Sequence, residues 1–120
     1  MRNLCYSLVN AVSNASTITS AKIDANQIVS ISAVCVQSDT DMAGSVKFQA
    51  SNDPTLASNL AADFTPTNWV DVPSATATIT AGAPAIITIA QNSYRWLRVV
   101  VTVGTPGSST CTVNVNALSI

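Results

Sequence analysis

The 120-residue chain has no histidine and no glutamate, and only 11 of its residues are charged. Soluble domains are usually about 25% charged, whereas charged residues make up 9% of this sequence. The lack of His and Glu removes the commonest general acids and bases. The polar surface must therefore come from Ser, Thr and Asn, with 15, 14 and 10 copies. These side chains do not repel identical molecules, so the composition favours a packed structural subunit over an enzyme.

Basic residues are also few, and the net charge is −1. A nucleic-acid partner would need a cluster of cations to replace the counterions of the phosphates. Only Arg95 and Arg98 lie close in sequence, and their odd spacing places them on opposite faces of a strand. No stretch approaches the roughly 20 apolar residues of a membrane-spanning helix. We therefore expect neither a nucleic-acid nor a membrane partner.

The three cysteines, Cys5, Cys35 and Cys111, form no Cys-x-x-Cys pair, and no histidine can share a metal site with them. Each lies among apolar residues, which predicts buried, reduced thiols in a protein assembled in the cytosol. One disulfide with a spare third thiol is the alternative.

Apolar and polar residues alternate along most of the chain, and Val, Ile and Thr are abundant. This pattern is typical of half-buried strands. The N-terminal run, which Ser7 interrupts, fits a first strand better than a cleaved signal peptide. We predict strands over 4–12, 17–24, 27–37, 45–51, 69–72, 75–80, 85–91, 94–103 and 110–118. This spacing predicts an all-β fold: one antiparallel β-sandwich or jelly-roll-like domain of about eight strands, covering residues 1–120.

Two of these runs, Gln27–Gln37 and Tyr94–Val103, carry apolar residues on both faces. In the first, we place Val29, Ile31, Ala33 and Cys35 on one face and Ile28, Val34 and Val36 on the other. Such strands are central in a sheet, or have an outer face that a partner covers. Pro73 is expected to end the strand before it, and few charges protect the sheet edges: Lys22, Lys47, Arg95 and Arg98.

One segment has a helical pattern. Asp53 is a suitable N-cap, Pro54 suits the first helical position, and Leu56 and Leu60 are four residues apart. We expect one short helix over Asp53–Leu60, in a long loop that ends near Pro66.

Asp39, Asp41 and Gly44 match the beginning of a calcium-binding loop. Ala43 and Ala50 occupy positions that would have to supply oxygen ligands, so an ordinary turn explains the residues better. An ion at this turn is the alternative.

No catalytic, cofactor-binding or metal-binding residue is predicted. A Ser or Cys nucleophile needs a positioned base, and the six aspartates lie mostly in or beside turns.

The aromatic residues are the other candidates for a binding site. A sugar-binding sandwich exposes several of them as a stacking platform, whereas core packing buries them. Phe48 shares a face with apolar neighbours and is expected in the core, and Trp96 is expected to be buried in the fold or in an interface. Trp69 follows a polar loop and is the best candidate for stacking on a sugar. The six are Tyr6, Phe48, Phe64, Trp69, Tyr94 and Trp96.

The succession Gly44-Ser45-Val46-Lys47-Phe48-Gln49-Ala50-Ser51-Asn52-Asp53, Asn68-Trp69-Val70-Asp71-Val72 and Tyr94-Arg95-Trp96-Leu97-Arg98-Val99 resembles small virion proteins of tailed bacteriophages. The resemblance spans roughly residues 44–118 and concerns pattern, without a catalytic motif. It implies a β-sandwich subunit of the particle, such as a capsid decoration protein or a head or tail accessory protein. It transfers no functional residue.

Our leading hypothesis is therefore a non-enzymatic virion component, assembled in the host cytoplasm. Its expected partners are further copies of itself and other capsid or tail proteins, through residues that the sequence does not identify. The alternative is a carbohydrate-binding module or receptor-binding tip. A secreted surface domain is a third interpretation, which requires loss of the N-terminal residues on export.

Overall fold

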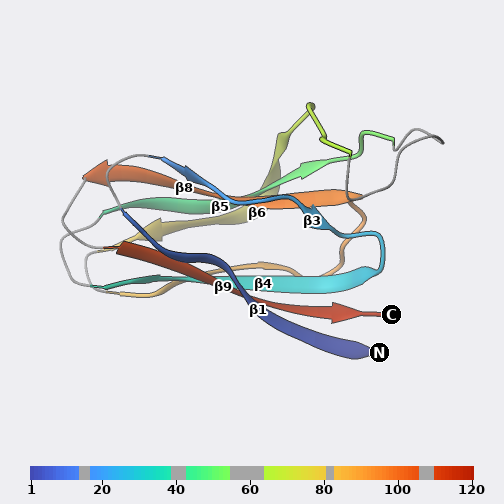
Figure 1. Cartoon of the computed structure of the whole chain (residues 1–120), viewed down its shortest axis with the longest axis horizontal. Helices are drawn as coiled ribbons and strands as arrows, with labels where there is room; N and C mark the ends of the chain where they lie inside the picture. Colours follow the sequence, from blue (N-terminus) through green and yellow to red (C-terminus); the bar gives the residue numbers. More distant parts are fainter. Residues whose placement is uncertain (14–16, 39–42, 55–63, 81–82, 106–109) are drawn as a thin grey trace.

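A computed structural model describes residues 1–13, 17–38, 43–54, 64–80, 83–105 and 110–120 (Figure 1). These residues form nine strands: β1 (Arg2–Ser13), β2 (Ile18–Thr19), β3 (Ile23–Asp24), β4 (Ile28–Gln37), β5 (Ala43–Ser51), β6 (Val70–Ile79), β7 (Ala85–Ile89), β8 (Trp96–Thr105) and β9 (Thr110–Ser119). The all-β prediction is confirmed. The helix predicted over Asp53–Leu60 is not, since the described residues contain no helix and residues 55–60 lie outside them. Accordingly, no described segment is a helix able to cross a membrane.

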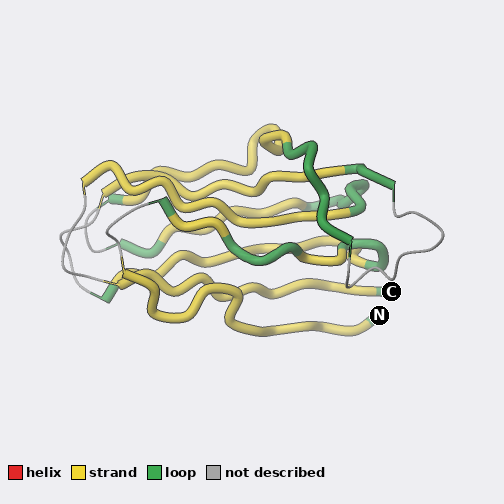
Figure 2. The backbone as a smooth tube through the Cα atoms, turned by 45° about the horizontal axis from the view of Figure 1, so that its top comes forward, coloured by secondary structure: helices red, strands yellow, loops and turns green. Residues whose placement is uncertain are grey.

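The strands form two antiparallel sheets that pack face to face (Figure 2). Sheet A has the order β1-β9-β4-β7. Sheet B has the order β2-β8-β5-β6, and β3 also pairs with β8. The chain passes repeatedly from one sheet to the other. As a result, the first strand and the last are neighbours in sheet A, and both termini lie at the same end of the sandwich (Figure 1).

The core lies between the two sheets and consists of the inward positions of alternating strands. Alternation places Val46, Phe48 and Ala50 of β5 and Cys111, Val113 and Val115 of β9 on the inward faces, and all six are buried. Outward residues of the same strands are mostly Ser, Thr, Asn and Gln. The alternation therefore shows which residues of each of these strands point into the core, because a residue and its second neighbour lie on the same face of a strand.

The two runs with apolar residues on both faces form β4 and β8, and both strands are central in their sheets. One detail of the predicted faces is wrong. A register shift between Ile28 and Ser30 turns Ile28 into the core, whereas Val34 and Val36 lie on the other face, which points outward. The extra residue of a bulge moves every side chain before it to the other face.

Pro73 does not end a strand, because β6 runs continuously from Val70 to Ile79. Residues 72–75 of β6 bulge out opposite the single residue Phe48 of β5. Ser74 in this bulge has a φ of 61°. The proline is tolerated since β6 is an edge strand, where a missing N–H need not break the ladder.

Two further predictions about strands need correction. The run 17–24 is split into the two short strands β2 and β3. Lys47 and Arg98 do not protect edges, because they lie on the central strands β5 and β8.

Gly44 belongs to β5 and not to the predicted turn that begins at Asp39, of which residues 39–42 lie outside the described residues. The strand passes very close to β8 at this point. A Cβ atom at Gly44 would lie 2.0 Å from the carbonyl oxygen of Thr102. Only glycine fits here without a backbone shift.

We expect Gly44→Ala to lower the free energy of unfolding by about 1–3 kcal/mol, as overpacked sites do. Gly104→Ala is the matched control, because its Cβ would lie 3.3 Å from the nearest atom, the carbonyl oxygen of Ala43. Urea denaturation of the two variants measures the difference. Equal decreases in the free energy of unfolding for the two variants would contradict the close approach of β5 and β8 at Gly44.

Candidate functional site: a polar pocket at one end of the sandwich

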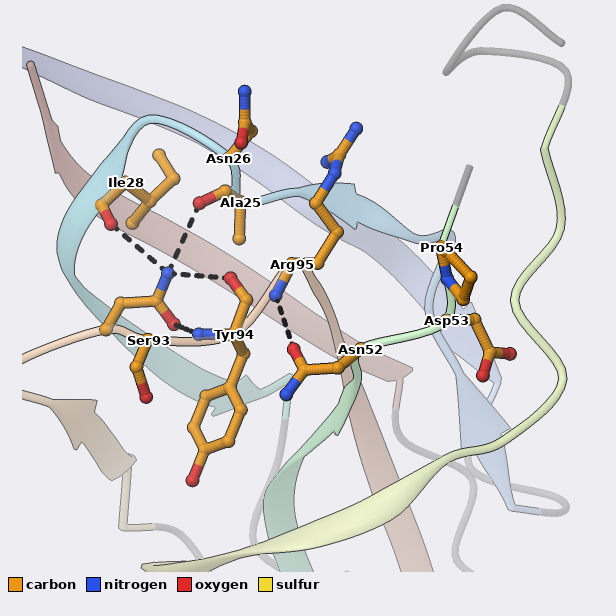
Figure 3. Close-up of a pocket in the computed structure, with 10 residues that line it drawn as sticks. Ala25, Asn26, Ile28, Asn52, Asp53, Pro54, Ser93, Tyr94 and Arg95 are labelled. Atoms are coloured by element: carbon orange, nitrogen blue, oxygen red, sulfur yellow. Dashed lines mark hydrogen bonds between the residues drawn. The ribbon is translucent and has the colours of Figure 1, made fainter. Parts of the chain in front are cut away.

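Three loop segments meet at the end of the sandwich that holds the termini (Figure 1). They are residues 25–27 before β4, residues 52–54 after β5 and residues 90–95 before β8. They enclose a cavity of about 450 Å³ (Figure 3). Its lining residues are Ala25, Asn26, Ile28, Asn52, Asp53, Pro54, Asn92, Ser93, Tyr94 and Arg95.

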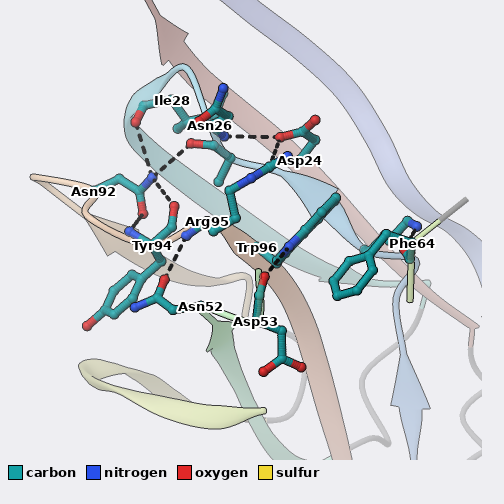
Figure 4. Close-up of polar contacts among 12 residues, drawn as sticks. Asp24, Asn26, Ile28, Asn52, Asp53, Phe64, Asn92, Tyr94, Arg95 and Trp96 are labelled. Atoms are coloured by element: carbon teal, nitrogen blue, oxygen red, sulfur yellow. Dashed lines mark hydrogen bonds and ion pairs between the residues drawn. The ribbon is translucent and has the colours of Figure 1, made fainter. Parts of the chain in front are cut away.

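Asn92 holds two of these segments together (Figure 4). Its Nδ2 atom lies 3.2 Å, 3.1 Å and 3.1 Å from the carbonyl oxygens of Ala25, Ile28 and Tyr94. Its Oδ1 atom accepts the N–H of Tyr94 at 3.2 Å. The amide is used on both sides to satisfy buried backbone groups, so Asn92 shapes the pocket wall.

Arg95 connects all three segments. Its guanidinium forms an ion pair with Asp24, and its backbone N–H donates to Asn52 Oδ1 at 2.9 Å. The carbonyl oxygen of Arg95 accepts the N–H of Ala25 at 3.0 Å. The same guanidinium lies 4.2 Å from the ring centre of Trp96, a cation–π contact.

Asp53 ties the segment after β5 to the segment that leads into β6. Its Oδ2 accepts the backbone N–H groups of Thr67 and Asn68 at 2.8 Å and 3.0 Å, and its Oδ1 accepts Asn68 Nδ2 at 2.8 Å. These hydrogen bonds, first those from Asn68, lower the pKa of Asp53 to about 2. The predicted N-cap role is thus not confirmed: the carboxylate accepts from residues far along the chain.

Trp96 lies on the outer face of sheet B, yet only 1% of it is exposed. Phe64 covers it at a ring-centre distance of 5.7 Å, and Lys22 Nζ lies 5.3 Å from its ring centre. The indole N–H donates to the carbonyl oxygen of Asp53 at 3.3 Å. Trp96 is therefore buried in the fold, one of the two surroundings expected for it, and Phe64 and the backbone of Asp53 lie against its ring (Figure 4).

A second cavity of about 360 Å³ adjoins the first and shares Asn52 and Tyr94 with it. Its other lining residues are Ala50, Ser51, Asn68, Val70, Asp71, Val72 and Pro73. Tyr94 thus separates a polar cavity from one with apolar residues of β6. The amides, phenol and guanidinium here can bind a polar ligand by hydrogen bonds.

Two carboxylates, those of Asp24 and Asp53, lie at this end of the sandwich. The carboxylates of Asp24 and Asp53 are held by hydrogen bonds, and the low pKa of Asp53 keeps it ionised. Within the described residues, no group of three Cys or Asp side chains can hold a metal ion. Asp39 and Asp41, the candidates for an ion site, lie outside those residues.

Trp69, the residue predicted to stack on a sugar, is half-buried and lines neither cavity. The guanidinium of Arg98 lies 4.4 Å from its ring centre, and its indole N–H donates to the carbonyl oxygen of Pro66. Arg98 Nε also donates to Gln49, which in turn donates to Asp71. This network crosses the outer face of sheet B and ends in the Lys47–Asp71 ion pair at 3.0 Å.

The remaining predicted residues occupy different surroundings. Phe48 is in the core, as predicted, whereas 42% of Tyr6 is exposed. Cys35 and Cys111 are buried, but Cys5 is exposed, which corrects the prediction for that thiol. Cys5 faces outward from edge strand β1, with its Sγ 3.3 Å from Asn116 Oδ1.

The outer face of sheet A differs from the rest of the surface because its outward residues are all uncharged. Among the described residues, all charged side chains except Arg2 lie on sheet B or in the segments next to it. By register, the outward residues of sheet A are Asn3, Cys5, Ser7, Ser30, Ser32, Val34, Val36, Ile86, Thr88, Thr112, Asn114, Asn116 and Leu118. The two-sided apolar run Gln27–Gln37 indicates one strand of this face, but the sequence does not reveal the whole face, because it combines four strands that are distant in the chain.

Comparison with known proteins yields similarity in structure only. No family model matches the sequence, and no curated protein matches it. PBSX exported protein XepA is similar with a TM-score of 0.68 and 14% identity, over 98% of this chain and 37% of XepA. SPBc2 prophage-derived protein YomS has a TM-score of 0.53 and 11% identity, over 98% of this chain and 94% of YomS.

A chitosan-binding module of a chitosanase/glucanase from Paenibacillus sp. IK-5 has a TM-score of only 0.41 at 21% identity, over 95% of this chain and 92% of the module. That score is too low to support an inference. The likeness to XepA and YomS shows a shared fold, and the chain spans little more than a third of XepA.

We expect Asp53→Asn to lower the melting temperature at pH 7 and to flatten its dependence on pH. The pKa of Asp53 is about 2, below the ordinary 3.8. Its contribution to stability is therefore complete above about pH 4 and is lost as the pH falls through 2. Circular dichroism melts between pH 2 and 7 measure this. Parallel curves for the variant and the wild type would contradict the role of the carboxylate.

Proposed function

We propose that this chain is a non-enzymatic structural component of a bacteriophage particle, with a capsid decoration or accessory role. It acts through protein–protein contacts: copies associate through the outer face of sheet A, and the loop end contacts other capsid or tail proteins. Neither nucleic acid nor membrane is a partner in this proposal.

The observation that carries the proposal is the fold shared with XepA and YomS over 98% of the chain, since YomS is prophage-derived by name and XepA is a PBSX exported protein, and both support a phage-associated role. A shared fold does not imply a shared function. It does agree with the independent resemblance to small virion proteins in the sequence around residues 44–118.

The strand order gives further support. The short strands β2 and β3 both pair with β8, so they are two parts of one interrupted strand. Counting them as one gives two four-stranded sheets, and we infer jelly-roll connectivity from their order. Jelly rolls are common in viral capsid proteins and in lectins.

The uncharged face of sheet A supports self-association. When two such faces pack, no charge has to be removed from water and no like charges meet. The same face on each copy can form a two-fold interface. Sheet B is less suited, because Lys47, Asp71 and Arg98 lie on its outer face.

The test is whether the chain co-purifies with particles from a culture that carries the parent phage and expresses a tagged copy. We expect density-gradient fractions of the particles to contain the wild-type chain at a fixed ratio to the major capsid protein. Asn114→Lys places a charge at an exposed position of sheet A and should abolish both self-association and incorporation.

Thr78→Lys is the matched control, since Thr78 is an exposed outward residue of sheet B. It should behave as the wild type in light scattering and in the gradient. A monomeric wild-type chain that is absent from particles would refute the proposal. If Asn114→Lys and Thr78→Lys reduce self-association and incorporation equally, the outer face of sheet A is not the interface between copies.

Glycan binding is the second candidate, favoured by the two adjoining cavities with Tyr94 between them. An aromatic ring beside amide groups suits a sugar. If this function is correct, glycan-array binding by the wild type should disappear in Tyr94→Ala and persist in Trp69→Ala. Loss only in Trp69→Ala would move the site to sheet B, and no binding by the wild type would remove this candidate.

A further inference from the structure

We propose that Cys35 and Cys111 are a disulfide site: they close to an intramolecular bond between β4 and β9 when the chain folds in an oxidising medium. Their Sγ atoms lie 3.2 Å apart, in contact but unbonded. This inference does not depend on the proposed function.

The register of sheet A brings the two sulfurs together. Cys35 pairs with Val113, and Gln37 pairs with Cys111. The cysteines are therefore diagonal neighbours on adjacent strands, and both point into the core, with 1% and 0% exposed. Diagonal pairs are farther apart than opposite pairs, but the contact between these sulfurs leaves only a small movement to a bond length of about 2.05 Å.

The third thiol is excluded from this pair by its position. Cys5 points outward from β1, beside Asn116, whereas Cys35 and Cys111 point into the core. A bond from Cys5 to either of them would have to cross the sheet. The structure thus selects one intramolecular pair from the three possible pairs.

The two thiols already share a hydrogen bond, and Gln37 Nε2 lies 3.3 Å from Cys35 Sγ. The bond between the thiols raises the pKa of Cys35 and lowers that of Cys111. These shifts belong to the folded chain, in which the two sulfurs are in contact.

The reaction is an ordinary thiol–disulfide exchange with an oxidant of the glutathione disulfide class. One of the two cysteine thiolates attacks the oxidant, forms a mixed disulfide and releases one small thiol. The other cysteine then loses its proton and attacks the protein sulfur of the mixed disulfide, which releases the second small thiol. Two protein thiols are oxidised, and one disulfide oxidant is reduced to two thiols.

Burial determines when this exchange can occur. No oxidant reaches sulfurs that are 1% and 0% exposed in the folded chain. The exchange must take place during folding, before β9 is covered, or during local opening. The product would link the two central strands of sheet A and close a long loop, which restricts the unfolded chain.

The experiment uses Cys5→Ser, which removes intermolecular products and leaves the pair intact. This protein is unfolded and refolded with glutathione disulfide or with a reductant, and both samples are alkylated in denaturant. We expect the oxidised sample to have no alkylated thiol and a mass lower by about 2 Da before alkylation, from the two hydrogens lost. Its melting temperature should rise by about 5–15 °C over the reduced sample.

Trypsin places each cysteine in a separate peptide, so the bond can be mapped. Residues 23–47 contain Cys35, and residues 99–120 contain Cys111. These two peptides should be linked in the oxidised sample and separate after reduction. In the wild type, the peptide 3–22 with Cys5 should be linked to neither of these two peptides.

Two alkylated thiols in refolded, oxidised Cys5→Ser would overturn the proposal, and so would a link from Cys5 to Cys35 or Cys111 in the wild type. The reduced sample shows independently that Cys5→Ser folds. Mass and peptide mapping do not involve phage particles, so a failure here is distinct from a failure of the proposed function.

Discussion

The burial of β-branched and other small apolar side chains between two sheets is the interaction on which this structure depends. With 9% charged residues and few aromatics, the chain has little else to stabilise it. Phe48 is the only aromatic side chain of the described core, and most of its neighbours are Val, Ile and Ala. Such a core requires close approach of the sheets and close spacing of the strands. Gly44 meets that requirement where β5 passes β8.

Polar side chains act more locally, because they hold together the loops at the end of the sandwich where the termini lie. Asn92, Arg95 and Asp53 each join segments that are far apart in sequence. Trp96 supports them from the outer face of sheet B, where it contacts Phe64 and the carbonyl oxygen of Asp53. The charged groups of the described residues are therefore concentrated on sheet B and its loops. Sheet A consequently has an uncharged outer face.

The alternation of residues was enough to predict the fold class, the central strands β4 and β8, and the inward residues of β5 and β9. It failed where a bulge changes the register, as at Ile28 and Pro73, because alternation does not reveal an extra residue. The site was not predictable in the same way. The partners of Asp53 and Asn92 depend on loop conformations, and a local motif suggested a helix cap in place of the long-range contact of Asp53.

The position of β9 between β1 and β4 constrains how the chain is made. β9 follows the other strands of sheet A in the chain, so β1 and β4 have no common neighbour until β9 has been synthesised. The backbone edges that β9 will pair stay open in the nascent chain until then, and sheet A is complete only once β9 has been added. A chain truncated before β9 would lack an internal strand of sheet A and not an edge strand. The open edges of β1 and β4 could then pair with other chains.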